Sequence, residues 1–134
     1  MSSDLIPQIL QQTRTIAVVG LSAHPSRAGF YVPAYLQEQG YRILPVNPHL
    51  TTALGEPAYP DLASVPDPID LVLIFRRPEH VPAVVEAAIR AGAKGVWMQL
   101  GIVHAAAAAQ ARAAGLAVVM DACMLVEHRK FKSK

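Results

Sequence analysis

The stretch TIAVVGLSAHPSR, residues 15–27, decides the fold. Residues 15–20 form a β-branched apolar run that ends in a glycine, and mostly small and polar residues follow. A run this continuously apolar predicts a strand of a parallel sheet, which is covered on both faces. This strand and the connection that follows it set where the rest of the chain must pack.

Four later runs share this apolar character, and helical patterns fill the gaps between them. The further predicted strands are 41–46, 70–75, 95–100 and 117–121. The predicted helices are 4–12 (with Ser3 as a cap), 28–39, 79–91, 104–114 and 122–130. This alternation predicts an α/β fold, with one doubly wound, Rossmann-like, mostly parallel sheet of five or six strands and helices on both faces.

Two places fit this pattern less well. Pro33 is compatible with the helix at 28–39 only near its first turn, where backbone N–H groups lack helical partners. Residues 47–69 carry five prolines and little periodicity, so we expect a loop with one short strand and one turn of helix. A loop of this length inside a small domain is usually functional.

Length and composition favour a single domain over residues 1–134. Of the 134 residues 52% are hydrophobic and 16% are charged, which fits a packed core. No apolar run is long enough for a membrane helix, and the N-terminus does not resemble a signal peptide. The single cysteine, Cys123, excludes an internal disulfide and a cysteine-based zinc site. We therefore expect a cytoplasmic protein.

The net charge of +2 depends on the C-terminus. Four basic residues lie in the last six, and without them eight basic residues face ten acidic ones, a balance of −2. A slightly acidic body argues against a nucleic-acid partner. For the basic end itself, a frayed and solvated segment is the plainer expectation.

The topology predicts where a ligand binds. The strand at 15–20 should lie between those at 41–46 and 70–75, and ligands of such sheets bind beyond the carboxyl ends at that switch point. Residues 20–27, 47–50 and 76–78 therefore converge there, with 99–104 alongside.

Several residues in these loops suit a phosphate-bearing ligand. Gly20 lets the backbone approach it, and the start of the next helix offers free N–H groups. Arg76 and Arg77 directly follow a buried strand, where a phosphate is a fitting partner. The candidate contacts read from the loops are Gly20, Ser22, Ser26, Arg27, Arg76, Arg77, Gln99 and Gly101.

Other site chemistries are not supported. The chain lacks G-x-G-x-x-G and has Asn47-Pro48 where a dinucleotide fold carries a ribose-binding acid, and it lacks the P-loop motif. We find no nucleophile–base arrangement. Cys123 is interpreted as a small buried side chain and His104 as a surface histidine, and the five histidines show no metal-ligand spacing.

From Thr15 to Arg129 the chain resembles the CoA-binding domain proteins, relatives of the N-terminal domain of the succinyl-CoA synthetase alpha subunit. The resemblance rests on four ordered segments, at 16–48, 74–82, 97–102 and 120–129. It implies a Rossmann-like fold that binds coenzyme A (CoA), with the first loop on the pyrophosphate and Asn47 and Pro48 along the adenosine. The charged Arg76 and Arg77, and His49-Leu50 where the synthetase has a lysine nearby, depart from that pattern. The domain carrying the synthetase's phosphorylated histidine has no counterpart in this sequence.

Three hypotheses remain open. The leading one is non-catalytic binding of CoA or an acyl-CoA, as a sensor or as the partner of an acyl-CoA enzyme, with the protein partner unidentified. The second is a small enzyme that uses an adenine dinucleotide or acts on an acyl-CoA. The third is a protein-interaction module with a vestigial nucleotide site. Turnover of acyl-CoA would favour the second, and a melting temperature unmoved by any nucleotide would favour the third.

Overall fold

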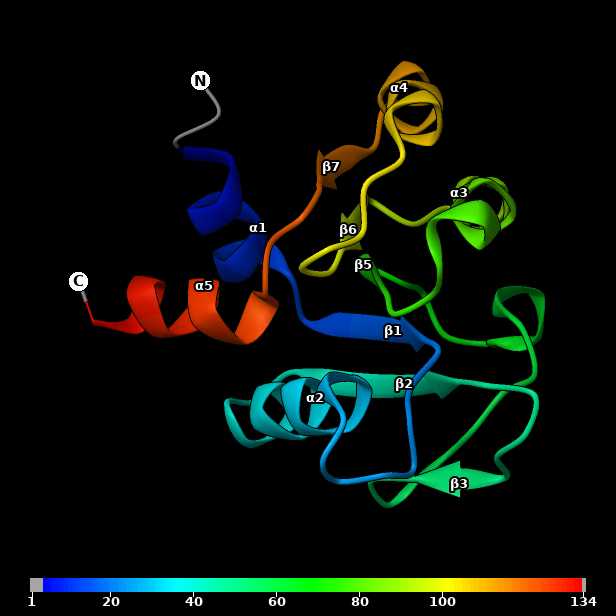
Figure 1. Ribbon diagram of the computed structural model, residues 1–134, viewed down its shortest axis with the longest axis vertical. Helices are drawn as coiled ribbons and strands as arrows, with labels where there is room; N and C mark the ends of the chain where they lie inside the picture. Colours follow the sequence, from blue (N-terminus) through cyan, green and yellow to red (C-terminus); the bar gives the residue numbers. More distant parts are fainter. Residues whose placement is uncertain (1–3, 134) are drawn as a thin grey trace.

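The sheet is five-stranded and entirely parallel. In the computed structural model, which describes residues 4–133, the strand order is β2-β1-β5-β6-β7 (Figure 1). These strands span Thr15–Val19 (β1), Arg42–Val46 (β2), Leu71–Ile74 (β5), Gly95–Met98 (β6) and Ala117–Val119 (β7). All five predicted strands are confirmed, and so is the position of the first between the second and the third. The doubly wound α/β fold is confirmed with them.

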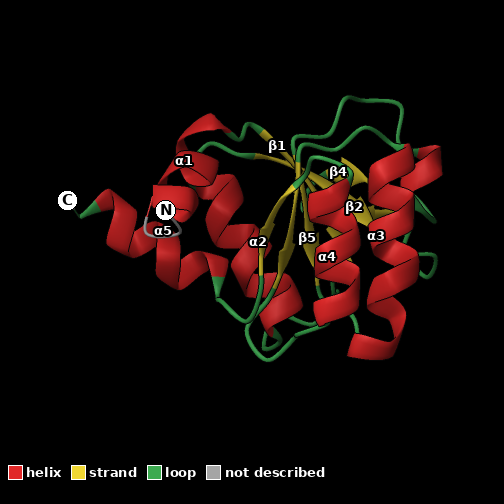
Figure 2. Cartoon of the chain, turned by 90° about the horizontal axis from the view of Figure 1, so that it is seen from above, coloured by secondary structure: helices red, strands yellow, loops and turns green. Residues whose placement is uncertain are grey.

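Five α-helices of the described residues cover the sheet. They are α1 (Leu5–Gln12), α2 (Ala28–Glu38), α3 (Val81–Arg90), α4 (Ala105–Ala113) and α5 (Met124–Lys132). Figure 2 shows α3 and α4 on one face and α1, α2 and α5 on the other. The predicted cap Ser3 lies outside the described residues. In the part of the chain that the structure describes, no helix is long and apolar enough to cross a membrane.

Alternate residues of each strand feed two separate cores. In β1, Ala17 and Val19 pack in the cluster with α3 and α4, while Ile16 and Val18 pack in the cluster with α1, α2 and α5. Trp97 in β6 is fully buried, and its indole N–H donates to the carbonyl of Ala122 at 2.8 Å. Burial on both faces is why the strands are apolar along their whole length.

The segment 47–69 contains more structure than predicted. Two two-residue strands, β3 (Thr52–Ala53) and β4 (Glu56–Pro57), form an antiparallel hairpin, and a 3₁₀ turn, η2, spans Leu62–Ser64. The expectation of one short strand was wrong, because strands this short are fixed by tertiary contacts and leave no periodicity in sequence. After the hairpin, Tyr59 forms a bridge with Val46 at the outer edge of β2.

Pro33 does not lie near the first turn of α2, as the sequence led us to expect. It is buried in the middle of the helix, where its missing N–H leaves the carbonyl of Gly29 without its usual partner. The backbone N–H of Ser22 donates to that carbonyl instead, at 3.0 Å. The helix is thus tied to the loop that follows β1, and the hydrogen bond lost to proline is replaced by a tertiary one.

The basic C-terminal residues are ordered on α5, so the expectation of a frayed end was wrong as far as Lys132. The Arg129 guanidinium lies 5.4 Å from the centre of the Tyr35 ring. The Lys132 ammonium donates to the Gln39 side chain at 3.0 Å. Both contacts join α5 to the C-terminal half of α2, and so they hold the two helices together.

Candidate functional site

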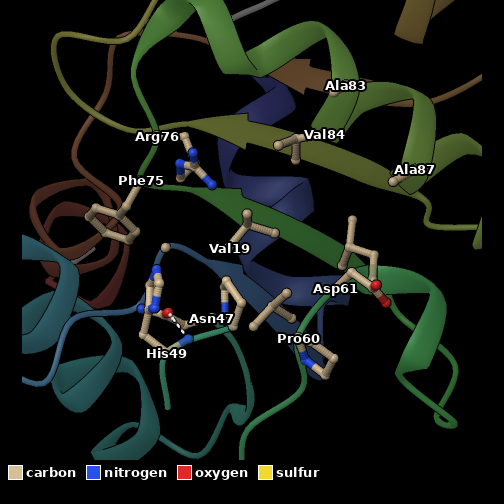
Figure 3. A pocket seen from close by; sticks show the side chains of 14 residues that line it. Val19, Asn47, His49, Pro60, Asp61, Phe75, Arg76, Ala83, Val84 and Ala87 are labelled. Carbon is tan, nitrogen blue, oxygen red and sulfur yellow. Dashed lines mark hydrogen bonds between the residues drawn. The ribbon is translucent and has the colours of Figure 1, made fainter.

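A cavity of about 550 Å³ opens beyond the carboxyl ends of β1, β2 and β5, where the winding of the sheet reverses. The segment before η2 and one side of α3 form its further walls, as Figure 3 shows. Its volume is in the range usual for small-molecule sites. The cavity is lined by Val19, Gly20, Val46, Asn47, Pro48, His49, Pro60, Asp61, Leu62, Phe75, Arg76, Ala83, Val84 and Ala87.

Gly20 forms the floor where β1 and β5 end side by side. Its φ of +89° is a backbone conformation that favours glycine. A Cβ at this position would lie 2.3 Å from the carbonyl oxygen of Phe75, inside van der Waals contact. The same Cβ would lie 3.1 Å from Cδ of Arg76, so the stem of that arginine packs across the glycine. Only glycine leaves this part of the cavity open.

Arg76 is a half-buried cation at the Gly20 end of the cavity. It extends from the end of β5 into the cavity (Figure 3). Among residues 4–133, no carboxylate lies within 4.0 Å of its guanidinium. The other charged side chain of the lining, Asp61, lies at the opposite end of the cavity, where it accepts from the N–H and hydroxyl of Ser64 at 3.0 and 2.7 Å. Positive charge therefore concentrates at the Gly20 end, which favours phosphate there.

Asn47 joins the two loops that border the cavity. Its Nδ2 donates to the carbonyl of Leu21 at 2.8 Å, and its Oδ1 accepts from the backbone N–H of His49 at 2.8 Å. An acid at this position would offer no donor to the Leu21 carbonyl, which is why the amide suits this junction. The residue that replaces the ribose-binding acid thus shapes the site.

The loop after β1 borders the cavity from the α2 side. Ser22 is half-buried, and its hydroxyl accepts from the N–H of His24 at 3.0 Å. Ser26 and Arg27 are exposed, with Arg27 just before the first residue of α2. None of these three is in the lining, so of this loop only Gly20 meets the cavity itself.

Sequence reasoning missed Gly29, the second glycine of this connection. A Cβ there would lie 3.2 Å from the carbonyl oxygen of Gly20 and 3.5 Å from Cβ of Ser22. The first turn of α2 therefore sits directly on the loop. The signal was a glycine in the first turn of a helix, a position where a larger residue has higher helix propensity.

The remaining candidates lie apart from the cavity lining. Arg77 is exposed, one residue beyond Arg76. Gln99 is buried, and its side-chain oxygen accepts from the N–H of Met124 at 3.2 Å, which fixes the start of α5. Gly101 has a φ of +86°, and its N–H donates to Asp121 at 2.7 Å. Of the ten candidate residues, the structure therefore brings four together in the lining of the cavity, Gly20, Asn47, Pro48 and Arg76, and places the other six outside it.

Groups with shifted pKa values lie elsewhere in the molecule. Burial raises the pKa of Tyr41 to about 12, with Tyr35 adding to the effect. The pKa values of Asp70 and His128 are lowered, and neither residue lines the cavity. Across residues 4–133, no cluster of three or more histidine, cysteine or acidic side chains is placed to hold a metal ion.

Comparison with known proteins identifies the family. A family model described as "CoA binding domain" matches residues 14–129. The chain belongs to this CoA-binding domain family. The resemblance read from the sequence is thereby confirmed at the level of the domain.

Relatives of this CoA-binding domain fall into two kinds. A Bacillus subtilis protein, YneT, described as uncharacterized, is 42% identical over 92% of this chain and 91% of its own length. An ADP-forming acetate–CoA ligase of Archaeoglobus fulgidus is 31% identical over 61% of the chain, a match that covers only 12% of the ligase.

Solved structures give the same two kinds. A Thermus thermophilus protein superimposes with a TM-score of 0.92 at 38% identity, over 98% of this chain and 99% of the other. A dinucleotide-forming acetyl-coenzyme A synthetase of Candidatus Korarchaeum cryptofilum superimposes with a TM-score of 0.69 at 26% identity, over 78% of this chain and 25% of the synthetase. The fold thus occurs in small proteins and as a part of large synthetases.

Proposed function

We propose that the chain is one CoA-binding domain, that it binds CoA or an acyl-CoA in the cavity at the switch point, and that it does so without catalysing a reaction. Membership of the family supports the choice of ligand. The relation to one segment of CoA ligases supports binding as a function separable from ligation. Residues outside that segment account for most of each ligase, so their activity is not carried over to this chain.

The observation that carries the proposal is Arg76, a half-buried residue whose stem packs over Gly20 and whose guanidinium has no carboxylate within 4.0 Å among the described residues. Removing a charge from water is costly unless an opposite charge meets it. A ligand phosphate above Gly20 would provide that charge. It would also occupy space that a side chain at Gly20 would otherwise fill.

The rest of the lining suits the adenosine half of CoA. Beyond Arg76 the walls are short and apolar, with Pro48 on one side and Ala83, Val84 and Ala87 of α3 on the other. Such walls accept a flat base. We place the pyrophosphate above Gly20, on the side of the cavity that is bordered by the loop carrying Ser22, Ser26 and Arg27, and the pantetheine arm leaving past the loop that holds Gln99 and Gly101.

Calorimetric titration with CoA tests the proposal, and the chain offers a matched control. We expect Arg76→Ala to weaken CoA binding about 10- to 100-fold, the cost of one charge-assisted hydrogen bond. Arg77→Ala removes the same charge one residue away, outside the lining, and is expected to change the affinity less than about threefold, the size of an exposed charge effect. Equal losses in the two variants would show a general charge effect and contradict a phosphate contact at Arg76.

The choice of nucleotide is tested in the same assay. CoA or an acyl-CoA should bind most tightly, dephospho-CoA more weakly, and NAD most weakly. Narrowing of the CoA–dephospho-CoA gap in Arg76→Ala would place the arginine on the 3′-phosphate, whereas equal weakening would place it on the pyrophosphate. NAD binding as tight as CoA binding would replace this proposal with a dinucleotide site.

The role in the cell follows from binding without turnover. We propose a cytoplasmic sensor of CoA or acyl-CoA, or a partner that receives the ligand from an acyl-CoA enzyme. Incubation with acetyl-CoA, followed by chromatography of the ligand, checks the non-catalytic part, and the expected result is unchanged acetyl-CoA. Release of free CoA at a rate that depends on the protein would favour an enzyme.

A further inference from the structure

His49 is the histidine of the cavity lining. It is the third residue after β2, and its backbone N–H donates to Oδ1 of Asn47 at 2.8 Å. Asn47 is in turn bonded to the carbonyl of Leu21, so the position of His49 is fixed relative to the loop after β1. Figure 3 shows its ring at the same end of the cavity as Phe75 and Arg76.

The charges around His49 are few. The charged side chains that line the cavity with it are Arg76, from the loop after β5, and Asp61, before η2 at the far end. β1, β2 and α3 contribute only uncharged residues to the lining. Within residues 4–133, no carboxylate lies within 4.0 Å of the imidazole. A proton on His49 would therefore add a second positive charge at the Arg76 end of the cavity, with no carboxylate of the described residues within 4.0 Å to pair with it.

Histidine is the ordinary side chain that changes charge between about pH 5 and 8. We infer that His49 makes this site pH-sensitive, so that a phosphate-bearing nucleotide binds more tightly in weak acid than in weak base. The inference rests on the proposed function, because it needs a phosphate at the Gly20 end of the cavity. It adds a control of affinity that Arg76, which keeps its charge throughout this range, does not supply.

The direction follows from linkage. A bound phosphate attracts a protonated imidazole and gains nothing from a neutral one. A phosphate-bearing ligand should therefore bind more tightly at the acid end of the histidine range and lose this gain at the basic end. One charge-assisted contact corresponds to about a tenfold gain in affinity.

The experiment titrates CoA into the native protein and into His49→Gln by calorimetry between about pH 5.5 and pH 8, the range in which histidine titrates. The 3′-phosphate of CoA also titrates, near pH 6 as phosphate monoesters do, but it is the same in both titrations. The ratio of the two Kd values therefore isolates His49. We expect His49→Gln to bind about tenfold more weakly than the native protein at the acid end and equally at the basic end. A ratio that stays constant across the range overturns the inference.

Two variants sharpen the result. His49→Lys keeps a positive charge at every pH used, so it should bind about tenfold more tightly than His49→Gln at both ends of the range. His80→Gln removes an exposed histidine outside the lining and should retain the native profile. Loss of the pH dependence in His80→Gln would place the titrating group outside the cavity and overturn the assignment. His49 is exposed, so its variants should fold, and circular dichroism at each pH confirms it.

A second ligand identifies the phosphate. If the pH dependence of the ratio persists with dephospho-CoA, His49 contacts the pyrophosphate, and if it appears only with CoA, the contact is to the 3′-phosphate. Either outcome supports the inference, and its absence with both ligands overturns it. CoA binding at pH 8 without a pH effect leaves the proposed function standing and removes only this inference. No CoA binding at any pH removes both.

Discussion

Replacing Gly20 by alanine should destabilise the fold more than the same change at a glycine with open space around it, such as Gly40. Two costs add at this position. The φ of +89° is unfavourable for any residue with a Cβ, by about 1–2 kcal/mol. The new Cβ would also lie 2.3 Å from the carbonyl oxygen of Phe75, a backbone atom and not the far end of a flexible side chain. Overpacking of this kind costs about 1–3 kcal/mol more.

Gly40 provides the control that separates the two costs. Its φ is +103°, yet no atom lies within 4 Å of the Cβ it would carry. Gly40→Ala should therefore lose only about 1–2 kcal/mol of unfolding free energy, and Gly20→Ala about 2–5 kcal/mol. For a domain of this size 1 kcal/mol lowers the melting temperature by roughly 4 °C.

Urea and thermal unfolding followed by circular dichroism measure both variants. If Gly20→Ala and Gly40→Ala lose the same stability, the contact with Phe75 contributes nothing, and the argument that the floor of the cavity requires glycine is refuted. If Gly20→Ala folds, it should also bind CoA more weakly than its loss of stability explains, because its methyl group occupies the proposed phosphate position.

Three further predictions concern groups outside the cavity. Burial alone would raise the pKa of Asp70, but the N–H groups of Arg14 and Thr15 and the charge of Lys94 outweigh it and lower the pKa. Its stabilising contribution should be present above the usual aspartate range and lost as the pH falls through the folded pKa, so the gap in urea midpoint between native protein and Asp70→Asn should close in strong acid. Burial lowers the pKa of His128, and Lys132 adds to the shift. As the pH falls, the unfolded chain therefore takes up the proton before the folded protein does, and the free energy of unfolding should decrease below the usual histidine range. A His128→Gln variant whose stability decreases equally over this range would contradict the prediction. Cys123→Ala should cost about 1 kcal/mol and leave CoA affinity unchanged, whereas alkylation of Cys123 that CoA blocks would place the thiol in the site.

The strands and the position of the cavity could be predicted from the sequence because buried strands leave a clear apolar pattern in it. Each parallel strand is covered on both faces, so runs such as 15–20 and 70–75 are apolar throughout. The order of alternating strands and helices then determines the switch point, and with it the region of the cavity. None of this requires knowledge of side-chain positions.

Finer features depend on tertiary contacts that sequence periodicity does not record. Pro33 is acceptable in mid-helix because Ser22, eleven residues earlier, donates to the Gly29 carbonyl. Arg76 and Arg77 are neighbouring residues of the same type, yet of the two only Arg76 lines the cavity. Which of them does so depends on the direction in which the chain leaves β5. Gln99 ends an apolar run as a ligand contact would, but it is bonded to Met124 in the interior.

The segment around Tyr59 runs along the outer edge of β2 and covers part of the edge that a second copy of the protein would need for strand pairing. Tyr59 donates to the carbonyl of Pro45 at 2.9 Å and accepts from the N–H of Asn47 at 2.8 Å. These are backbone groups that a strand from a second copy would need for pairing. Pro45 itself has no N–H to offer, and at the opposite edge β7 is only three residues long. The edge of β2 is therefore partly covered by the protein's own backbone, which disfavours edge-to-edge pairing of two sheets, and the covering segment is the one that also borders the cavity.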